Sequence, residues 1–356
     1  MTDNRRTKST IDDVAKKAKV SKTTISRYIN GKYEYMSEAT RDTILKVIEE
    51  LDYRPSNIAR SLKSQKSGVV GCVIADITSP FSSYLVKGIN DVCKKNGYQV
   101  LFVNTDNNKQ SEIESIQSLL DNNLDGLIVN TTGFNDDYLV ETHNKSIPMV
   151  MADRCLKNKY LLDTVTTDNY QSTFDCIKFL QKQGYDKIAF FTQGLGEISS
   201  RYLRHNAFID AIDKLYALDG NDYTYLIDTN DLSVCINNLH KLKDEYPGEN
   251  IGIFTVNGVT LMNVLTAMKE EDYIPGTDFG ICGFDDWGWA SLIPPGITTI
   301  TQDSYTTGVM SAELLIQRIE KGISKKKKFM ELPTQLTVRG STTPHNKKGV
   351  ITNEQN

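Results

Sequence analysis

A stretch near the N-terminus combines short polar and cationic side chains at the spacing of one helix face. This face carries Lys22, Thr23, Ser26 and Arg27, and the further candidate DNA-contacting residues are Thr10, Ser21 and Asn30. Side chains of this kind reach phosphates, and an arginine can donate two hydrogen bonds to one guanine in the major groove. We therefore predict that Arg27 reads a base. The phosphates would be positioned by Thr10, Ser21 and Asn30.

Two short helices joined by a tight turn must hold these side chains. Thr10 is a suitable N-cap for the first helix, and two aspartates stand in its first turn, where the helix dipole favours anions. Ser21 caps the second helix, whose apolar positions are Ile25 and Ile29. A third helix is predicted from Ser37, with an apolar stripe that packs on the pair. A generic amphipathic helix pair at a protein surface is the alternative interpretation.

The charge distribution favours a nucleic-acid partner for the N-terminal part alone. Residues 1–66 contain 15 Lys/Arg and 9 Asp/Glu, a net charge of +6. Because the whole chain carries −4, the remainder carries −10. A small basic head on an acidic body is expected when one domain docks on phosphates and the other does not.

Polar and aromatic side chains follow the ends of several predicted strands in the longer, C-terminal part. Apolar runs alternate there with amphipathic stretches, which predicts an α/β architecture with doubly wound parallel sheets. Ligands bind such sheets outside the carboxyl ends of the strands. Asp76 and Asn130 are two polar residues that follow predicted strands in this way. The candidate ligand-binding residues are Phe81, Asp153, Arg154, Arg201, Arg204, Asn257, Asp285 and Trp287. Carboxylates, arginines and aromatic rings together suit a polyhydroxylated ligand such as a sugar.

The motifs of common enzyme classes are missing from the sequence. It contains no G-x-S-x-G, no Walker A and no H-E-x-x-H, and its four histidines do not cluster. The six cysteines are scattered without a C-x-x-C, and no apolar run is long enough to span a bilayer. The segment MTDNRRTKST has no apolar core, so no signal peptide is expected. We expect a cytoplasmic protein that is not an enzyme and uses no cofactor, metal or membrane.

The N-terminal stretch resembles the helix-turn-helix of the LacI/GalR family of bacterial transcription regulators. The resemblance rests on T-I-x-D-V-A at Thr10–Ala15, V-S-x-x-T-I-S-R at Val20–Arg27 and the pair Asn30-Gly31. It continues through SEATRDTILKVIEELDYRP to NIARSLKS at Asn57–Ser64. Many positions match at the right spacing, so this resemblance implies a DNA-binding regulator.

The resemblance also implies a hinge helix after the third helix. Its candidate DNA contacts are Asn57, Arg60, Leu62 and Lys63. Leu62 stands where the family has a leucine that is wedged into the minor groove at the centre of the operator, which kinks the duplex. The segment is too short to be a stable isolated helix, so we expect it to fold on binding. An ordinary linker role for Leu62 is the alternative.

A weaker resemblance covers the chain up to about Arg339 and implies the periplasmic-binding-protein-like fold. Arg204 in R-H-N-A-F is similar to the family's effector arginine, and Asp285 in G-F-D-D is similar to its effector aspartate. Asn257 matches the asparagine of the family's usual N-D, but Gly258 replaces the aspartate. The resemblance therefore implies an effector site that differs from the usual one beside Asn257.

We predict four parts along the chain. They are a helix-turn-helix domain at 1–55, a hinge helix and linker at 56–67, an effector-binding and dimerisation domain at 68–341, and a polar tail at 342–356. The third part is predicted to contain two subdomains. These are 68–168 with 301–326, and 169–300 with 327–341.

Two classes of function follow. The favoured one is a homodimeric transcription regulator, a repressor of carbohydrate catabolism, that binds double-stranded operator DNA and is controlled by a sugar, sugar acid or sugar phosphate. EYMSEATR and GFDDWGWASLIPPGITTITQDSY resemble the family branch that controls ketodeoxygluconate and hexuronate use, and Arg201, one turn from Arg204, suits a carboxylate-bearing sugar. The alternative is a solute-binding protein of the same core fold, which the basic head and the missing signal peptide disfavour.

Overall fold

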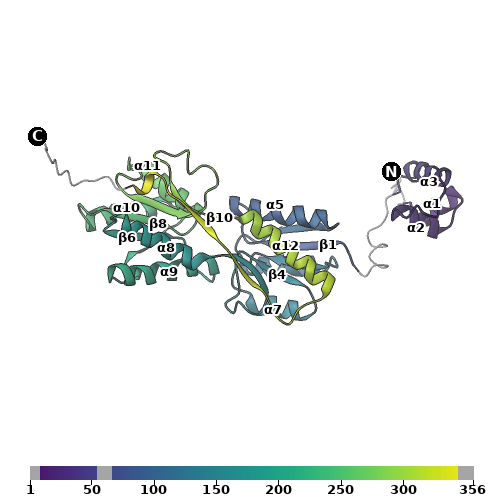
Figure 1. Ribbon diagram of the computed structural model, residues 1–356, viewed down its shortest axis with the longest axis horizontal. Coiled ribbons are helices and arrows are strands. Elements are labelled where there is room, and N and C mark those ends of the chain that lie inside the picture. Colours follow the sequence, from purple (N-terminus) through teal and green to yellow (C-terminus); the bar gives the residue numbers. More distant parts are fainter. Residues whose placement is uncertain (1–8, 54–65, 344–356) are drawn as a thin grey trace, which may run out of the picture. The chain divides into compact units, whose positions relative to one another are not determined.

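The computed structural model describes residues 9–53 and 66–343, and the chain divides into two compact units after Gly68 (Figure 1). The N-terminal unit is helical. Its helices are α1 (Ile11–Ala18), α2 (Lys22–Ile29) and α3 (Glu38–Glu50). A capping box starts α1, because the Asp13 carboxylate accepts from the Thr10 N–H at 2.9 Å while the Thr10 hydroxyl accepts from the Asp13 N–H. Lys19, at a φ of 54°, ends α1 and turns the chain.

The apolar positions of the three helices converge on one small core. Val14 of α1, Ile25 of α2 and Ile44 of α3 are completely buried. The core is completed by Ala15, Ala18, Val47 and Tyr53. The predicted helix-turn-helix head is therefore confirmed. A core of this size leaves the unit only marginally stable, because small domains bury a small share of their surface.

Two six-stranded sheets form the second unit, and each defines one lobe. The first lobe has the strand order β11-β5-β4-β3-β1-β2 with all pairs parallel. Its strands are β1 (Val69–Ile74), β2 (Gln99–Asn104), β3 (Gly126–Val129), β4 (Met149–Ala152), β5 (Asp163–Thr167) and β11 (Phe329–Leu332). The second lobe has the order β12-β10-β9-β8-β6-β7, in which β12 runs antiparallel to β10 and the other pairs are parallel. Its strands are β6 (Lys187–Thr192), β7 (Thr224–Leu226), β8 (Ile251–Thr255), β9 (Gly280–Phe284), β10 (Thr298–Gln302) and β12 (Thr334–Thr337).

Helices cover the sheets, as expected for nearly continuous apolar strands. In the first lobe they are α5 (Pro80–Lys95), α6 (Lys109–Leu120), α7 (Asp136–Asn144) and α12 (Ser304–Lys321). In the second lobe they are α8 (Asn169–Lys182), α9 (Ser199–Tyr216), α10 (Leu232–Glu245), α11 (Gly258–Glu270) and the short 3-10 helices η1 (Gly220–Tyr223) and η2 (Gly340–Thr342). Cys72 and Val73 are neighbours on β1 but belong to different core clusters, so the sheet is packed on both faces. The predicted doubly wound α/β class is confirmed.

α12 returns from the C-terminal part of the chain to pack beside α5 (Figure 1). Gly88 of α5 and Gly308 of α12 allow this close approach. A Cβ on Gly88 would lie 3.0 Å from the backbone nitrogen of Val309, and one on Gly308 would lie 3.1 Å from that of Ile89. This packing fixes the start of α12, and with it the end of β10 that borders the cavity between the lobes.

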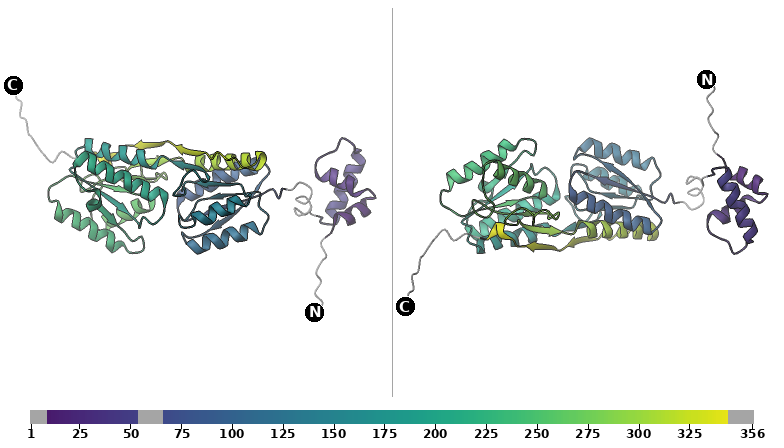
Figure 2. Two further views of the ribbon diagram at one scale, coloured as in Figure 1. Left: turned by 90° about the horizontal axis from the view of Figure 1, so that it is seen from below. Right: turned by 90° about the horizontal axis from the view of Figure 1, so that it is seen from above.

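The chain passes between the lobes after β5, after β10 and after β11, and the third passage differs from the prediction. The prediction that follows the family resemblance places residues 327–332 in the second subdomain. In the structure β11 pairs with β5 in the first lobe, from Phe329 opposite Thr164 to Leu332 opposite Thr167. Pro333 has no N–H and separates β11 from β12, which pairs with β10. Figure 2 shows this C-terminal segment running along both lobes. The boundary therefore lies at Pro333.

Candidate DNA-reading surface and effector cleft

The face of α2 opposite the core presents the predicted DNA contacts. Lys22, Thr23 and Arg27 are exposed, and Ser26 is half-buried. The Ser21 hydroxyl caps α2 by accepting from the Thr24 N–H at 3.1 Å. This face of the helix is free of core contacts, as a helix lying in a major groove requires.

Two of the predicted phosphate contacts also serve the ends of the helices. The Thr10 hydroxyl donates to Asp13 Oδ2 at 2.7 Å. Asn30 Nδ2 donates to the Ser26 carbonyl at 2.7 Å, which satisfies a carbonyl at the end of α2. The predicted hinge contacts Asn57, Arg60, Leu62 and Lys63 lie outside the described residues.

Seven of the eight predicted ligand residues line one narrow cavity of about 80 Å³ in the second unit. They are Phe81, Asp153, Arg154, Arg201, Arg204, Asn257 and Asp285. The first lobe contributes Phe81 from α5 and the residues that follow β4, and the second lobe contributes the others. The cavity therefore lies between the lobes, at the carboxyl ends of both sheets, where ligands of such folds bind.

Arg204 is held in place by the second lobe. It is buried on α9, where its Nε donates to Asn169 Oδ1 at 2.8 Å and its Nη1 donates to the Val256 carbonyl at 2.7 Å. Its Cζ lies 3.5 Å from the centre of the Phe284 ring, a cation–π contact. Burial lowers the pKa of Arg204 to about 10, and nearby carboxylates oppose this shift. The guanidinium remains charged at neutral pH and has a fixed orientation.

Asp285 follows β9 and is held by two donors. Its Oδ1 accepts from Gln302 Nε2 at 2.6 Å, and its Oδ2 accepts from the Gly258 N–H at 3.1 Å. The second donor is the first N–H of α11, where the helix dipole favours an anion. Because Gln302 ends β10 just before the chain crosses to the first lobe, Asp285 is linked directly to a crossover.

The first lobe contributes a buried acid and a largely buried arginine. Asn130 Nδ2 donates to Asp153 Oδ2 at 3.0 Å, and burial raises the pKa of Asp153 although Arg154 and Arg204 oppose the shift. Arg154 Nη1 donates to Asn107 Oδ1 and to the Thr131 carbonyl, both at 2.9 Å. The Arg154 Nε is buried, has no hydrogen-bond partner among the described residues and lies 4.0 Å from Asp153 Oδ2.

Arg201 adds a third guanidinium to the cavity. Its Nη1 donates to the Gly194 carbonyl at 2.7 Å, and within residues 9–53 and 66–343 no carboxylate forms an ion pair with it. Burial, with a smaller contribution from Arg154, lowers the pKa of Arg201 to about 10. Arg154 and Arg201 therefore offer donors to an anionic group on a ligand.

Trp287 is not among the residues that line this cavity, and its contact with a ligand stays a prediction. Its ring lies against Gly258, the first residue of α11. Trp287 belongs to the loop after β9 in the second lobe, yet it packs against the core of the first lobe. The Asn257 side chain lines the cavity and also caps α11, because its Oδ1 accepts from the Thr260 N–H at 2.9 Å.

Several lining residues are not among the predicted ligand contacts. They include Asp76 and Asn130, and also Gln193 and Gln302 at the ends of β6 and β10. The rule that ligands bind at the carboxyl ends of strands already places Asp76 and Asn130 there, and it would also have found Gln193 and Gln302. Ser79, Ser82, Ile198, Ser200 and Val259 complete the lining.

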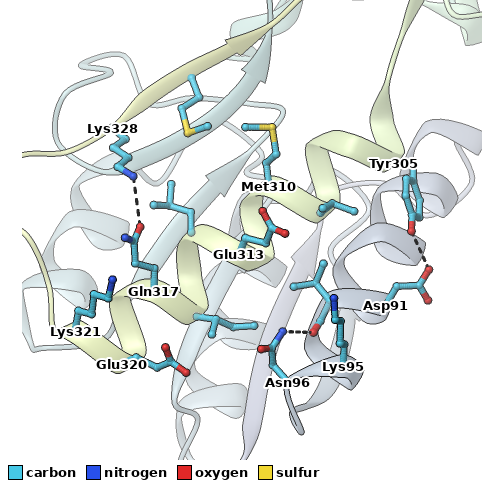
Figure 3. Close-up of a pocket in the computed structure, with 15 residues that line it drawn as sticks. Asp91, Lys95, Asn96, Tyr305, Met310, Glu313, Gln317, Glu320, Lys321 and Lys328 are labelled. Atoms are coloured by element: carbon cyan, nitrogen blue, oxygen red, sulfur yellow. Dashed lines mark hydrogen bonds between the residues drawn. The ribbon is translucent and has the colours of Figure 1, made fainter.

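A larger cavity of about 800 Å³ lies elsewhere, between α5, α12 and β11 of the first lobe (Figure 3). Figure 3 shows the Tyr305 hydroxyl donating to Asp91 and Lys328 donating to Gln317 at its rim, at 3.1 and 3.4 Å. None of the predicted ligand residues lines it. Its lining, as far as the structure describes the chain, alternates lysines with carboxylates and includes no arginine. It therefore differs from the cavity between the lobes, where arginines converge.

In the described ranges, no helix is both long and apolar enough to cross a membrane. Residues 10–56 match the description "Bacterial regulatory proteins, lacI family", and residues 70–322 match "Periplasmic binding protein domain". The two matches cover the head and most of the two-lobed unit.

Known regulators are similar to the chain over nearly its whole length. The HTH-type transcriptional regulator KdgR of Bacillus subtilis is 38% identical over 333 residues, which are 94% of this chain and 97% of that protein. PtxS of Pseudomonas aeruginosa is 33% identical over 338 residues, 94% of this chain and 96% of that protein. A Lac repressor dimer bound to operator and an anti-inducer has the same fold, with a TM-score of 0.80 at 22% identity over 95% of this chain and 100% of that one. The chain thus belongs to the LacI family of bacterial regulatory proteins, and it is a DNA-binding transcription regulator and not an enzyme.

Proposed function

We propose that the protein is a homodimeric repressor of carbohydrate catabolism that acts in the cytoplasm on near-palindromic operator DNA. A small sugar or sugar acid in the cavity between the lobes would set its affinity for the operator. The observation that carries this proposal is the cavity itself, in which both lobes present fixed carboxylates and guanidinium groups. One head offers few base contacts, so two symmetry-related heads on two half-sites are needed for useful specificity.

The chemistry of the cavity favours an effector that carries a carboxylate. Asp285 and Asp153 suit hydroxyl donors, while Arg154 and Arg201 retain donors for an anion. A sugar acid of the ketodeoxygluconate or hexuronate type has both kinds of group. A sugar phosphate is the second candidate for the same donors, because guanidinium groups also bind phosphate bidentately.

Closure of the lobes is the proposed signal. The Cys155 N–H of the first lobe donates to Ser199 Oγ of the second at 2.8 Å, and an ion pair between Lys157 and Glu197 crosses at 2.8 Å. An effector that contacts both lobes favours the arrangement it fits better. In a dimer this would pair or separate the two hinge segments. A coupling free energy of about 1–3 kcal/mol would change operator affinity roughly 5- to 150-fold.

A two-step experiment tests the proposal. A thermal-shift screen with sugars, sugar acids and sugar phosphates identifies compounds that stabilise the protein. Gel shifts on the promoter of its own operon, with and without each compound, then measure the response. We expect a sugar acid to stabilise the protein and to change its affinity for the promoter. Stabilisation by neutral sugars alone would contradict the proposed role of Arg154 and Arg201.

A solute-binding protein of the same core fold is not favoured. The match of residues 10–56 to the LacI family accounts for the basic head, which a solute-binding protein would not need. Light scattering adds an independent check. A monomer at micromolar concentration, both with and without promoter DNA, would contradict the proposed dimer.

A further inference from the structure

Tyr35 is an aromatic residue that the folding of the N-terminal unit does not explain. It lies in the loop between α2 and α3, and 81% of its surface is exposed. This is the largest exposed fraction for a large apolar side chain in the described part of the protein. The core cluster of the three helices does not include it. An aromatic ring presented to solvent beside a DNA-reading helix requires another reason.

The ring of Tyr35 lies against the residue predicted to read a base. The Cζ atom of Arg27 is 5.6 Å from the centre of the Tyr35 ring. Arg27 stands in the last turn of α2 and is exposed, so its long side chain has few other constraints. A guanidinium donates two parallel hydrogen bonds to guanine only when its plane matches the plane of the base. A ring that lies against the guanidinium restricts the orientations it can take before DNA is bound.

Tyr33 provides a comparison within the same loop. The Cζ atom of Arg41 lies 4.2 Å from the centre of its ring, and the ring of Tyr28 meets it edge-on at 5.8 Å. Tyr33 thus joins α2, the loop and α3, and only 39% of it is exposed. Its role is explained by folding. The two tyrosines form similar cation–π pairs, but only the arginine partner of Tyr35 lies on the DNA-reading face of α2.

We propose that Tyr35 is a positioning residue of the DNA interface, where it orients the Arg27 guanidinium toward one guanine and is covered by the duplex. This inference rests on the proposed function, in which Arg27 reads a base. Removal of water strengthens a cation–π pair, so the contact between Tyr35 and Arg27 is stronger in the complex than in the free protein. Tyr35 therefore contributes to affinity and to the choice of base at a single position of each half-site.

Binding measurements on the full-length protein test this inference. The operator is first selected from random double-stranded DNA, and fluorescence anisotropy then compares wild type, Tyr35→Ala, Tyr35→Phe, Arg27→Ala and the double alanine variant. Tyr35→Ala should weaken binding roughly 2- to 30-fold per half-site and relax preference at the base pair that Arg27→Ala also relaxes. Tyr35→Phe should retain both properties. The double variant should bind no more weakly than Arg27→Ala, because Tyr35 acts through Arg27.

Two controls separate positioning from folding and from phosphate contact. Tyr33→Ala should lower the melting temperature and leave the base preference unchanged, whereas Tyr35→Ala should leave the melting temperature unchanged. The salt dependence of binding should be the same for wild type and Tyr35→Ala, since tyrosine neutralises no phosphate.

The outcomes distinguish this inference from the proposed function. If Arg27→Ala relaxes a base preference that Tyr35→Ala preserves, the role of Tyr35 is wrong and the proposed function stands. A loss in Tyr35→Ala that is uniform across sequences and additive with Arg27→Ala also overturns the inference. If wild type selects no sequence from the random pool, both the inference and the proposed function fail.

Discussion

The indole of Trp287 fills the space that any larger residue would need in place of Gly258. A Cβ at position 258 would lie 2.7 Å from Cζ2 of Trp287 and 2.8 Å from its Cζ3. Gly258 is the first residue of α11, and its N–H donates to Asp285. In this chain a glycine at position 258 therefore leaves room for the large ring at position 287. Trp287 also packs on the core of the first lobe, so it links the site of Asp285 to the opposite lobe.

Gly258→Ala should be destabilising because of Trp287 alone. The alanine methyl displaces the indole, and overpacking of this kind costs about 1–3 kcal/mol. In a Trp287→Leu background the same change should cost little, since a helix start accepts alanine. Thermal unfolding of the two single variants and the double variant measures this coupling. Equal losses of stability from Gly258→Ala in both backgrounds would show that the indole is not the obstacle.

Effector binding should change the fluorescence of Trp287. The chain has two tryptophans, and the ring of Trp289 lies 6.4 Å from that of Trp287. A Trp289→Phe variant isolates the emission of Trp287, which contacts both lobes. Saturating effector should shift this emission if the lobes move relative to each other. Emission that stays constant while operator affinity changes would contradict closure as the signal.

The sequence contains enough local information to predict the caps and most of the cavity, but not every partner across the sheets. Ser21 caps α2 because capping depends on neighbouring residues. Arg204 and Asp285 meet because parallel strands of both lobes end at the same cleft. The four residues of β11 carry no pattern that selects a sheet. Their pairing with β5 is a contact between segments that lie far apart in the sequence. The direction of the Trp287 ring is likewise not predictable, because the ring occupies space that Gly258, a residue distant in sequence, leaves open.

Asp153→Asn should stabilise the ligand-free protein at neutral pH. Burial raises the pKa of Asp153 above its ordinary value of 3.8, so the folded state binds a proton more tightly than the unfolded state. Stability is then lost as the pH rises from about the unfolded pKa through the higher folded pKa. Asparagine cannot ionise and avoids this loss. Urea unfolding of wild type and variant at a series of pH values, from mildly acidic to neutral, should show the difference growing with pH. If the stability advantage of the variant over wild type shrinks with rising pH, folding does not raise the pKa of Asp153 and the prediction is wrong.

Arg201→Met should reduce the preference for acidic effectors over neutral sugars. Methionine keeps much of the apolar stem and removes the guanidinium, whose bond to the Gly194 carbonyl lies at the edge of the cavity. A charge-assisted hydrogen bond contributes roughly 1.5–3 kcal/mol, so affinity for a sugar acid should fall about 10- to 150-fold. Calorimetry with the acid and with its neutral parent sugar measures the ratio. A proportional loss for both compounds would show that Arg201 does not contact the carboxylate.

Asp285→Asn should abolish the effector response and leave operator affinity without effector nearly intact. Asp285 has a φ of 76°, which asparagine tolerates far better than alanine, so the substitution changes charge without backbone strain. If Gln302 turns its amide, its Oε1 can accept from the amide of the introduced asparagine, which preserves the link to the crossover after β10. The turn gives up the 3.5 Å bond that Arg204 Nη2 donates to this oxygen. Asp286→Asn is the matched control, because Asp286 pairs with Arg339 away from the cavity and should leave the effector response in place. If Asp285→Asn binds its sugar acid as tightly as wild type by calorimetry, the cavity assignment fails. If it binds no effector and its operator affinity still changes on effector addition, the cavity is not the origin of the response and closure between the lobes is not its mechanism.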